Sequence, residues 1–151
     1  MGRLYVVNHS VAVSTGITII QVKAGSNKPF KVIEASVSQN TSTANAQAVV
    51  ALLRKSGAAT VTSFTPLKIS PNDPAADAVG GTAATGITAT AEGTDGDILH
   101  RKSFNILNEW LYLPVPEQRI LVPITGIIAL KFMAGPTNAT YTAHIIFEEQ
   151  D

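Results

Sequence analysis

Hydrophobic and polar residues alternate in short runs along this chain of 151 residues, and turn-forming residues separate the runs. In Phe30–Ser38, the apolar residues Ile33, Ala35 and Val37 alternate with polar ones, and Thr140–Glu148 shows the same period. A period of two is typical of a β-strand with one side turned to water. The expected strands are Leu4–Val7, Ile17–Lys23, Phe30–Ser38, Ala46–Arg54, Thr60–Leu67, Ile98–Leu107, Arg119–Val122, Gly126–Met133 and Thr140–Glu148.

The run Ala46–Arg54 does not alternate and fits two structures. Most of its residues are good helix formers, and Asn45 and Gly57 stand where helix caps would stand. It also lies between two expected strands of similar length, and a single helix would require a sheet face left open for it. We therefore predict a strand for this run.

The stretch Asp73–Gly96 differs from the rest of the chain. It consists mainly of Ala, Thr and Gly, and Val79 and Ile87 are its large side chains. Long loops without secondary structure are uncommon unless they bind something. We expect a long excursion at about residues 73–96, which is either a mobile surface segment or a segment that reaches a neighbour.

The elements together predict one all-β domain over residues 1–151. Many short strands joined by turns favour a two-sheet antiparallel β-sandwich of jelly-roll type. An immunoglobulin-like sandwich ranks second, because the Cys–Trp–Cys landmarks of that class are absent from the sequence.

Composition adds an expectation about the surface. Hydrophobic residues make up 45% and charged residues 15% of the chain, whereas about 25% charged residues is usual. The surface must then be Thr, Ser, Asn and Ala, or partly apolar, and large apolar patches indicate a partner. Eleven basic and eleven acidic residues cancel, so we predict neither a nucleic-acid nor a membrane partner.

Candidate chemistry is sparse. The chain has no cysteine, which fits a reducing cytosol, and its three histidines lack metal-binding spacing. We found no serine-nucleophile motif and no phosphate loop, so we predict no catalytic residue, no cofactor and no enzyme. The stretch Glu92–Asp97 intersperses carboxylates with glycines, which permits a calcium loop or a solvated turn. We favour the solvated turn and predict no metal site.

One apolar stretch is a candidate contact surface. Trp110, Leu111, Tyr112 and Leu113 follow one another and are closed by Pro114. Exposed on the surface, they would form an oligomer contact; buried, Trp110 and Tyr112 would close one end of the sandwich core.

Several stretches carry a likeness to a known family. They are Pro29–Glu34, Leu52–Arg54, Asn72–Pro74, Gly86–Thr94 and Ile145–Glu149. Taken together, the chain resembles small structural proteins of tailed bacteriophages, the capsid decoration (head auxiliary or cement) proteins. The resemblance implies a jelly roll that forms a homotrimer, binds the major capsid protein and sits on the virion surface after assembly in the host cytoplasm. It also makes the stretch of residues 110–113 a candidate capsid contact.

Two other functions remain open from the residues alone. A receptor-binding head of a phage tail or fibre would also be rich in β-structure, and residues 73–96 would then supply its recognition loop. A carbohydrate-binding β-sandwich would need an aromatic platform or calcium.

Overall fold

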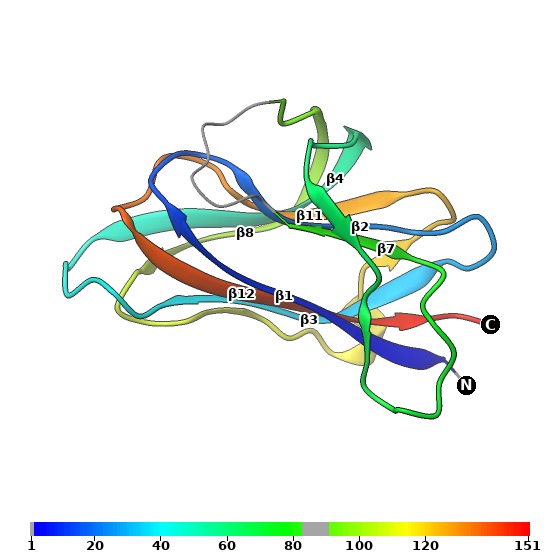
Figure 1. Cartoon of the computed structure of the whole chain (residues 1–151). Helices are drawn as coiled ribbons and strands as arrows, with labels where there is room; N and C mark the ends of the chain where they lie inside the picture. Colours follow the sequence, from blue (N-terminus) through cyan, green and yellow to red (C-terminus); the bar gives the residue numbers. More distant parts are fainter. Residues whose placement is uncertain (1, 83–90) are drawn as a thin grey trace.

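The structure is a computed structural model that describes residues 2–82 and 91–151, and it consists of two antiparallel β-sheets packed face to face (Figure 1). Sheet A contains β1 (Arg3–Val13), β3 (Phe30–Gln39), β6 (Leu67–Lys68), β9 (Trp110–Tyr112), β10 (Leu121–Val122) and β12 (Ala139–Glu149). Sheet B contains β2 (Thr18–Lys23), β4 (Gln47–Gly57), β5 (Thr62–Phe64), β7 (Val79–Thr82), β8 (Thr94–Asn105) and β11 (Ile127–Phe132). A short 3-10 helix, η1, spans Pro116–Gln118.

The strand order is that of a jelly roll. In sheet A the order is β6-β1-β12-β3-β10, with β9 on the same edge of β3 as β10; in sheet B it is β5-β7-β2-β11-β4-β8. Without β5, β6 and β7, the chain forms β1-β12-β3-β9/β10 facing β2-β11-β4-β8, the two-sheet arrangement of that fold. The predicted all-β, two-sheet antiparallel β-sandwich of jelly-roll type is confirmed.

The core lies between the sheets and follows the alternation seen in the sequence. In β12, Tyr141, Ala143, Ile145 and Phe147 are buried, while the residues between them are exposed or half-buried. The ring of Phe147 contacts the ring of Phe30, with centroids 4.8 Å apart. Side chains of one face in each strand therefore form the interior.

The ambiguous run Ala46–Arg54 is a strand, as predicted. It forms most of β4, which lies between β11 and β8. Val50 and Leu52 face the core between the sheets, and Ala51 and Leu53 are buried on the opposite face. A strand covered on both sides has no polar positions in alternation, which is why its sequence also suits a helix.

The expected excursion at about residues 73–96 contains regular structure. Val79–Thr82 forms β7, which pairs with β2 and β5, and the stretch from Thr94 onward belongs to β8. Gly80 faces Val7 so closely that a Cβ atom would lie 2.9 Å from a Val7 methyl group, and a Cβ atom at Gly81 would collide with Val61. The glycines that suggested a loop are therefore needed in a closely packed strand. Residues 83–90 of the excursion, Ile87 among them, lie outside the described residues.

The expected strand Thr60–Leu67 is divided between the two sheets. Thr62–Phe64 forms β5 in sheet B, and Leu67–Lys68 forms β6 in sheet A. Pro66 lies at the break, where its missing N–H group cannot continue a ladder. The described residues 58–82 and 91–93 thus form an insertion between β4 and β8 that adds strands to one edge of both sheets.

Candidate interaction surface

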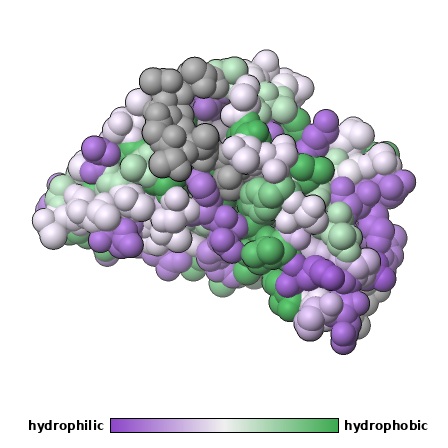
Figure 2. Space-filling view, in the orientation of Figure 1, coloured by the Kyte–Doolittle hydropathy of each residue, from purple (hydrophilic) through white to green (hydrophobic). Residues whose placement is uncertain are grey.

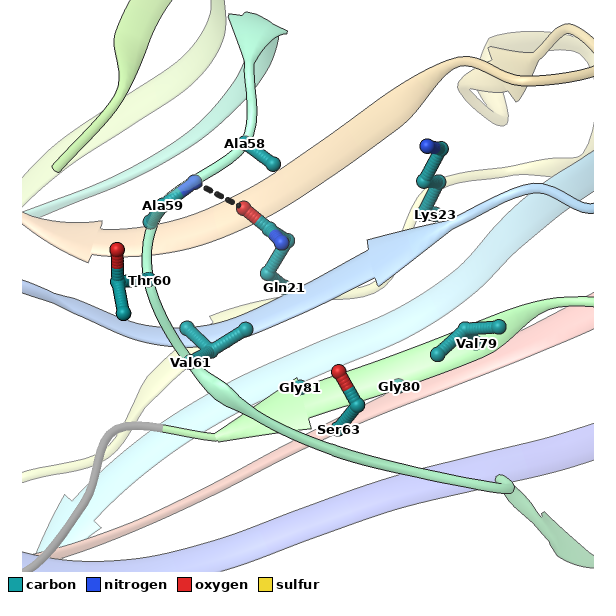
Figure 3. A pocket seen from close by; sticks show the side chains of 10 residues that line it. All are labelled: Gln21, Lys23, Ala58, Ala59, Thr60, Val61, Ser63, Val79, Gly80 and Gly81. Atoms are coloured by element: carbon teal, nitrogen blue, oxygen red, sulfur yellow. Dashed lines mark hydrogen bonds between the residues drawn. The ribbon is translucent and has the colours of Figure 1, made fainter. Parts of the chain in front are cut away.

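The described part of the insertion also covers part of the outer face of sheet B, the face turned away from sheet A. After Gly57 the chain crosses β11, β2 and β7 to reach β5 (Figure 3). The Gln21 carboxamide oxygen accepts a hydrogen bond from the Ala59 N–H group, 2.8 Å away, and both residues are buried. The Thr60 N–H group donates to the Ala91 carbonyl, 2.9 Å away. The first bond fixes the crossing segment against β2, and the second joins this segment to the returning part of the insertion.

A buried lysine anchors the return of the insertion. The Lys55 ammonium group donates to the Asp95 carboxylate at 2.7 Å and to the Glu92 carbonyl at 2.6 Å. Lys131 donates to the other Asp95 oxygen at 2.6 Å, and Glu92 accepts from the Thr18 hydroxyl at 2.7 Å. Burial raises the pKa of Asp95, but hydrogen bonds from Lys131 and Lys55 outweigh burial and hold that pKa below its ordinary value.

This cluster changes the interpretation of the acidic stretch Glu92–Asp97. The sequence permits a calcium loop or a solvated turn and favours the turn. The structure instead pairs Glu92 and Asp95 with two lysines, so these carboxylates already neutralise protein cations. The stretch is a structural anchor, and the sequence could not show this because Lys55 and Lys131 lie 36 or more positions from Asp95.

A cavity of about 390 Å³ lies beside the crossing segment, between it and strands β2 and β7 (Figure 3). Its lining residues are Gln21, Lys23, Ala58, Ala59, Thr60, Val61, Ser63, Val79, Gly80 and Gly81. Lys23 is the one titratable side chain in this lining, and Gln21 is engaged with Ala59. The cavity lacks the convergent polar groups that orient a small ligand, so we assign it no ligand.

The outer face of sheet A contrasts with that of sheet B. Its β1 positions are Leu4, Val6, Asn8, Ser10 and Ala12, which are all uncharged and exposed or half-buried. On the neighbouring strand β12, its positions include Thr142, His144 and Ile146, which are also exposed or half-buried. The insertion therefore covers part of the outer face of sheet B. On the outer face of sheet A, the uncharged positions of β1 lie beside strands β12 and β3, which carry Glu148, Lys31 and Glu34.

Three hydrogen-bonded polar side chains lie in the middle of this face. The Ser36 hydroxyl lies 2.9 Å from Nδ1 of His144, and Nε2 of His144 lies 3.0 Å from the Glu34 carboxylate. Serine, histidine and a carboxylate also form the catalytic relay of serine hydrolases. In that relay the serine contacts Nε2 of the histidine, whereas Ser36 contacts Nδ1 of His144 and is only 5% exposed. Ser36 also sits in a strand paired with both β12 and β9, so ladder bonds use the N–H groups around it. These side-chain hydrogen bonds join β3 to β12. His144 faces out of the pleat, as expected.

One edge of this face carries four adjacent aliphatic side chains, which we call the aliphatic block: Leu4, Val6, Leu67 and Ile69. Val6 pairs directly with Leu67, and the Ile69 N–H group donates to the Leu4 carbonyl at 3.1 Å. Directly opposed residues point to the same face. Leu4, Leu67 and Ile69 are 38%, 55% and 48% exposed. Figure 2 shows hydrophobic residues gathered in a band where Figure 1 places the green insertion and the blue start of β1.

The predicted contact stretch Trp110–Leu113 lies at the opposite edge of sheet A, and only half of it is available. Trp110 is fully buried and Tyr112 is 8% exposed, so these two side chains take the second of the two alternatives and close the core. Their rings pack against His100, with centroids 5.5 and 5.1 Å away. Leu111 and Leu113 are 40% and 64% exposed, because alternation along β9 turns neighbouring side chains to opposite faces.

Comparison of the chain with protein-family models, with curated proteins and with solved structures found no match to any of them. Among residues 2–82 and 91–151, no helix has the length and apolar character needed to cross a membrane.

Proposed function

We propose that the protein is a non-enzymatic viral structural protein that attaches to the outside of an assembled bacteriophage capsid and stabilises it. The observation that supports this most is on the outer face of sheet A: the outward positions of β1 are uncharged, and exposed aliphatic side chains lie at both edges of the sheet. The jelly-roll fold and the sequence resemblance to decoration proteins point the same way.

The exposed leucines at the β9 edge are the proposed capsid contact. Leu111 projects from the edge strand β9 opposite Ser36, and Leu113 follows directly after this strand. The centres of protein interfaces are depleted in charged residues, and a repeated lattice multiplies a modest contact by avidity. The partners in this proposal are the major capsid protein and further copies of the chain, as a homotrimer on the virion surface, assembled in the host cytoplasm.

Binding to the assembled shell, and not to free capsid subunits, would stabilise the shell by mass action. The test uses capsids stripped of the protein, whose temperature of genome release is followed with a DNA-binding dye. Stripped capsids should release DNA at a lower temperature, and the purified protein should restore the original value.

Two variants test which surface of the protein contacts the capsid. Leu113→Lys should fail to restore capsid stability, because it puts a charge into the interface. Thr60→Lys, on the exposed side of the crossing segment, should restore it fully. Labelled protein that binds host cells and not capsids would replace this proposal with a receptor-binding head, and retention on a defined glycan column without capsid binding would replace it with a carbohydrate-binding module.

A further inference from the structure

We propose that the aliphatic block of Leu4, Val6, Leu67 and Ile69 is the surface through which copies of this chain associate with one another. This inference deepens the proposed function, in which self-association is one part, but it concerns an edge of sheet A that the sequence did not single out. Its test needs no capsid.

The insertion builds this block. Leu67 belongs to β6, a strand of two residues that pairs with β1 only because the insertion passes along that edge. Without β6, Leu4 and Val6 would be two isolated aliphatic side chains, which are ordinary on a protein surface. With β6, four aliphatic residues lie together, and a contiguous exposed apolar patch indicates an interaction site.

The block is held in a fixed arrangement by bonds around it. The Tyr5 hydroxyl donates to the Pro74 carbonyl at 3.2 Å, and the buried Glu149 carboxylate accepts from the Ala78 N–H group at 2.8 Å. The Asp77 carboxylate accepts from the N–H groups of Asn27 and Lys28. These bonds tie the insertion to sheet A on the C-terminal side of β6. A surface ordered before binding loses less conformational entropy when a partner docks.

Charge around the block favours a neutral partner. Arg3 contacts the Asp151 carboxylate at 3.2 Å and the Asp73 carboxylate at 3.9 Å, and Lys28 contacts Asp151 at 3.0 Å. These ion pairs join charged groups beside the block within a single protomer, and Glu148, which lies opposite Leu4 in the β1–β12 ladder, adds one negative charge at the border of the block. Most of the charge at this edge therefore needs no opposite charge from a partner. Further copies of the chain present the same aliphatic side chains, and these meet where the copies surround a three-fold axis, as in the proposed homotrimer.

The β8 edge is a less suitable route for self-association. The Ile106 N–H group donates to the Ala46 carbonyl, and in an antiparallel ladder every second residue of a strand bonds to the same neighbour. The N–H and C=O groups of Arg101 and Ser103, at odd spacing from Ile106, therefore point away from β4. A symmetric pairing of two such edges would place Arg101 or Lys102 against its own copy. A register shift at Leu99 also bends the strand, and both features are known to keep sheet edges apart.

The experiment measures the mass of the full chain in solution by light scattering and sedimentation velocity. The natural protein should form an oligomer at micromolar concentration, and Leu67→Lys should yield a 15.8 kDa monomer, with the dissociation constant raised by at least about 30-fold, as for a central interface residue. Ile69→Lys should act in the same way, and it serves if Leu67→Lys does not fold. Leu67→Met should keep the oligomer.

Leu113→Lys is the matched control, since Leu113 is more exposed than Leu67 and lies at the opposite edge of the same sheet. It should leave the oligomer intact. A monomeric natural protein, an unchanged oligomer in both block variants, or dissociation by Leu113→Lys would overturn the inference. An oligomer that depends on the block but does not bind capsids would instead overturn only the proposed function.

Discussion

The ammonium group of Lys55 is completely buried and lies 2.7 Å from the carboxylate of Asp95, which pairs with it across strands β4 and β8. Removal of one partner of a buried ion pair leaves the other partner desolvated without compensation, and this costs far more than the net contribution of the intact pair. The pair also marks the point where the insertion returns to the sandwich.

Asp95→Ala should therefore lower the free energy of unfolding by about 2–4 kcal/mol, toward the lower end of the cost of breaking buried pairs because Asp95 is partly exposed. Lys55 would retain the Glu92 carbonyl and a carboxylate 4.0 Å away. Asp97→Ala, an exposed carboxylate on the same strand, should change it by less than about 0.5 kcal/mol. Urea unfolding measures both, and equal effects would show that Asp95 has no special role.

The carboxyl groups of Asp77 and Asp95 make stability depend on pH in the acidic range. The hydrogen bond from the Asn27 N–H group is the largest contribution that lowers the pKa of Asp77 below its ordinary value of 3.8, and Asp95 also has a lowered pKa. A carboxyl group whose pKa is lower in the folded state adds stability above 3.8 that disappears as the pH falls through its folded pKa.

Thermal unfolding should therefore show a loss of stability as the pH is lowered from 5 to about 2. The double variant Asp77→Asn, Asp95→Asn should lose less than the natural protein over that interval. Equal losses would mean that other groups carry the acid response.

His100 should add a second pH effect with a different window. Burial lowers its pKa below the ordinary value of 6.5, with a smaller effect from the charge of Lys102, and its ring lies against Trp110 and Tyr112. The unfolded chain then binds a proton at a higher pH than the folded chain, so stability should fall as the pH drops below 6.5. His100→Gln should flatten the profile of stability against pH just below pH 6.5, and an unchanged slope would show that other groups cause that loss of stability.

The sequence predicted the sheets well because each strand with one wet side carries its own period, as in Phe30–Ser38. It was less informative where tertiary structure covers both sides, as in β4, or where glycines serve close packing, as at Gly80 and Gly81. The sequence could have predicted which side chains of residues 110–113 are buried, since alternation alone puts Trp110 and Tyr112 on one face and Leu111 and Leu113 on the other. The aliphatic block was not, because Val6 and Leu67 meet only after the insertion folds back onto β1.

The free edge of sheet B leads to the last prediction. β8 is the final strand on its side of sheet B in the part of the chain that the structure describes, and nearly all of its side chains from Thr94 to Ser103 are exposed. Exposed edges recruit other strands unless charges or bulges prevent it, and here Arg101 and Lys102 provide the charge. The double variant Arg101→Val, Lys102→Thr should therefore form aggregates that bind thioflavin T as its concentration rises.

The charge-reversed variant Arg101→Glu, Lys102→Glu is the matched control. It alters the same two positions but keeps like charges on the edge, so it should remain as soluble as the natural protein in light scattering. Aggregation of both variants would indicate damage to the fold, and aggregation of neither would show that the bend at Leu99 protects the edge without help from charge.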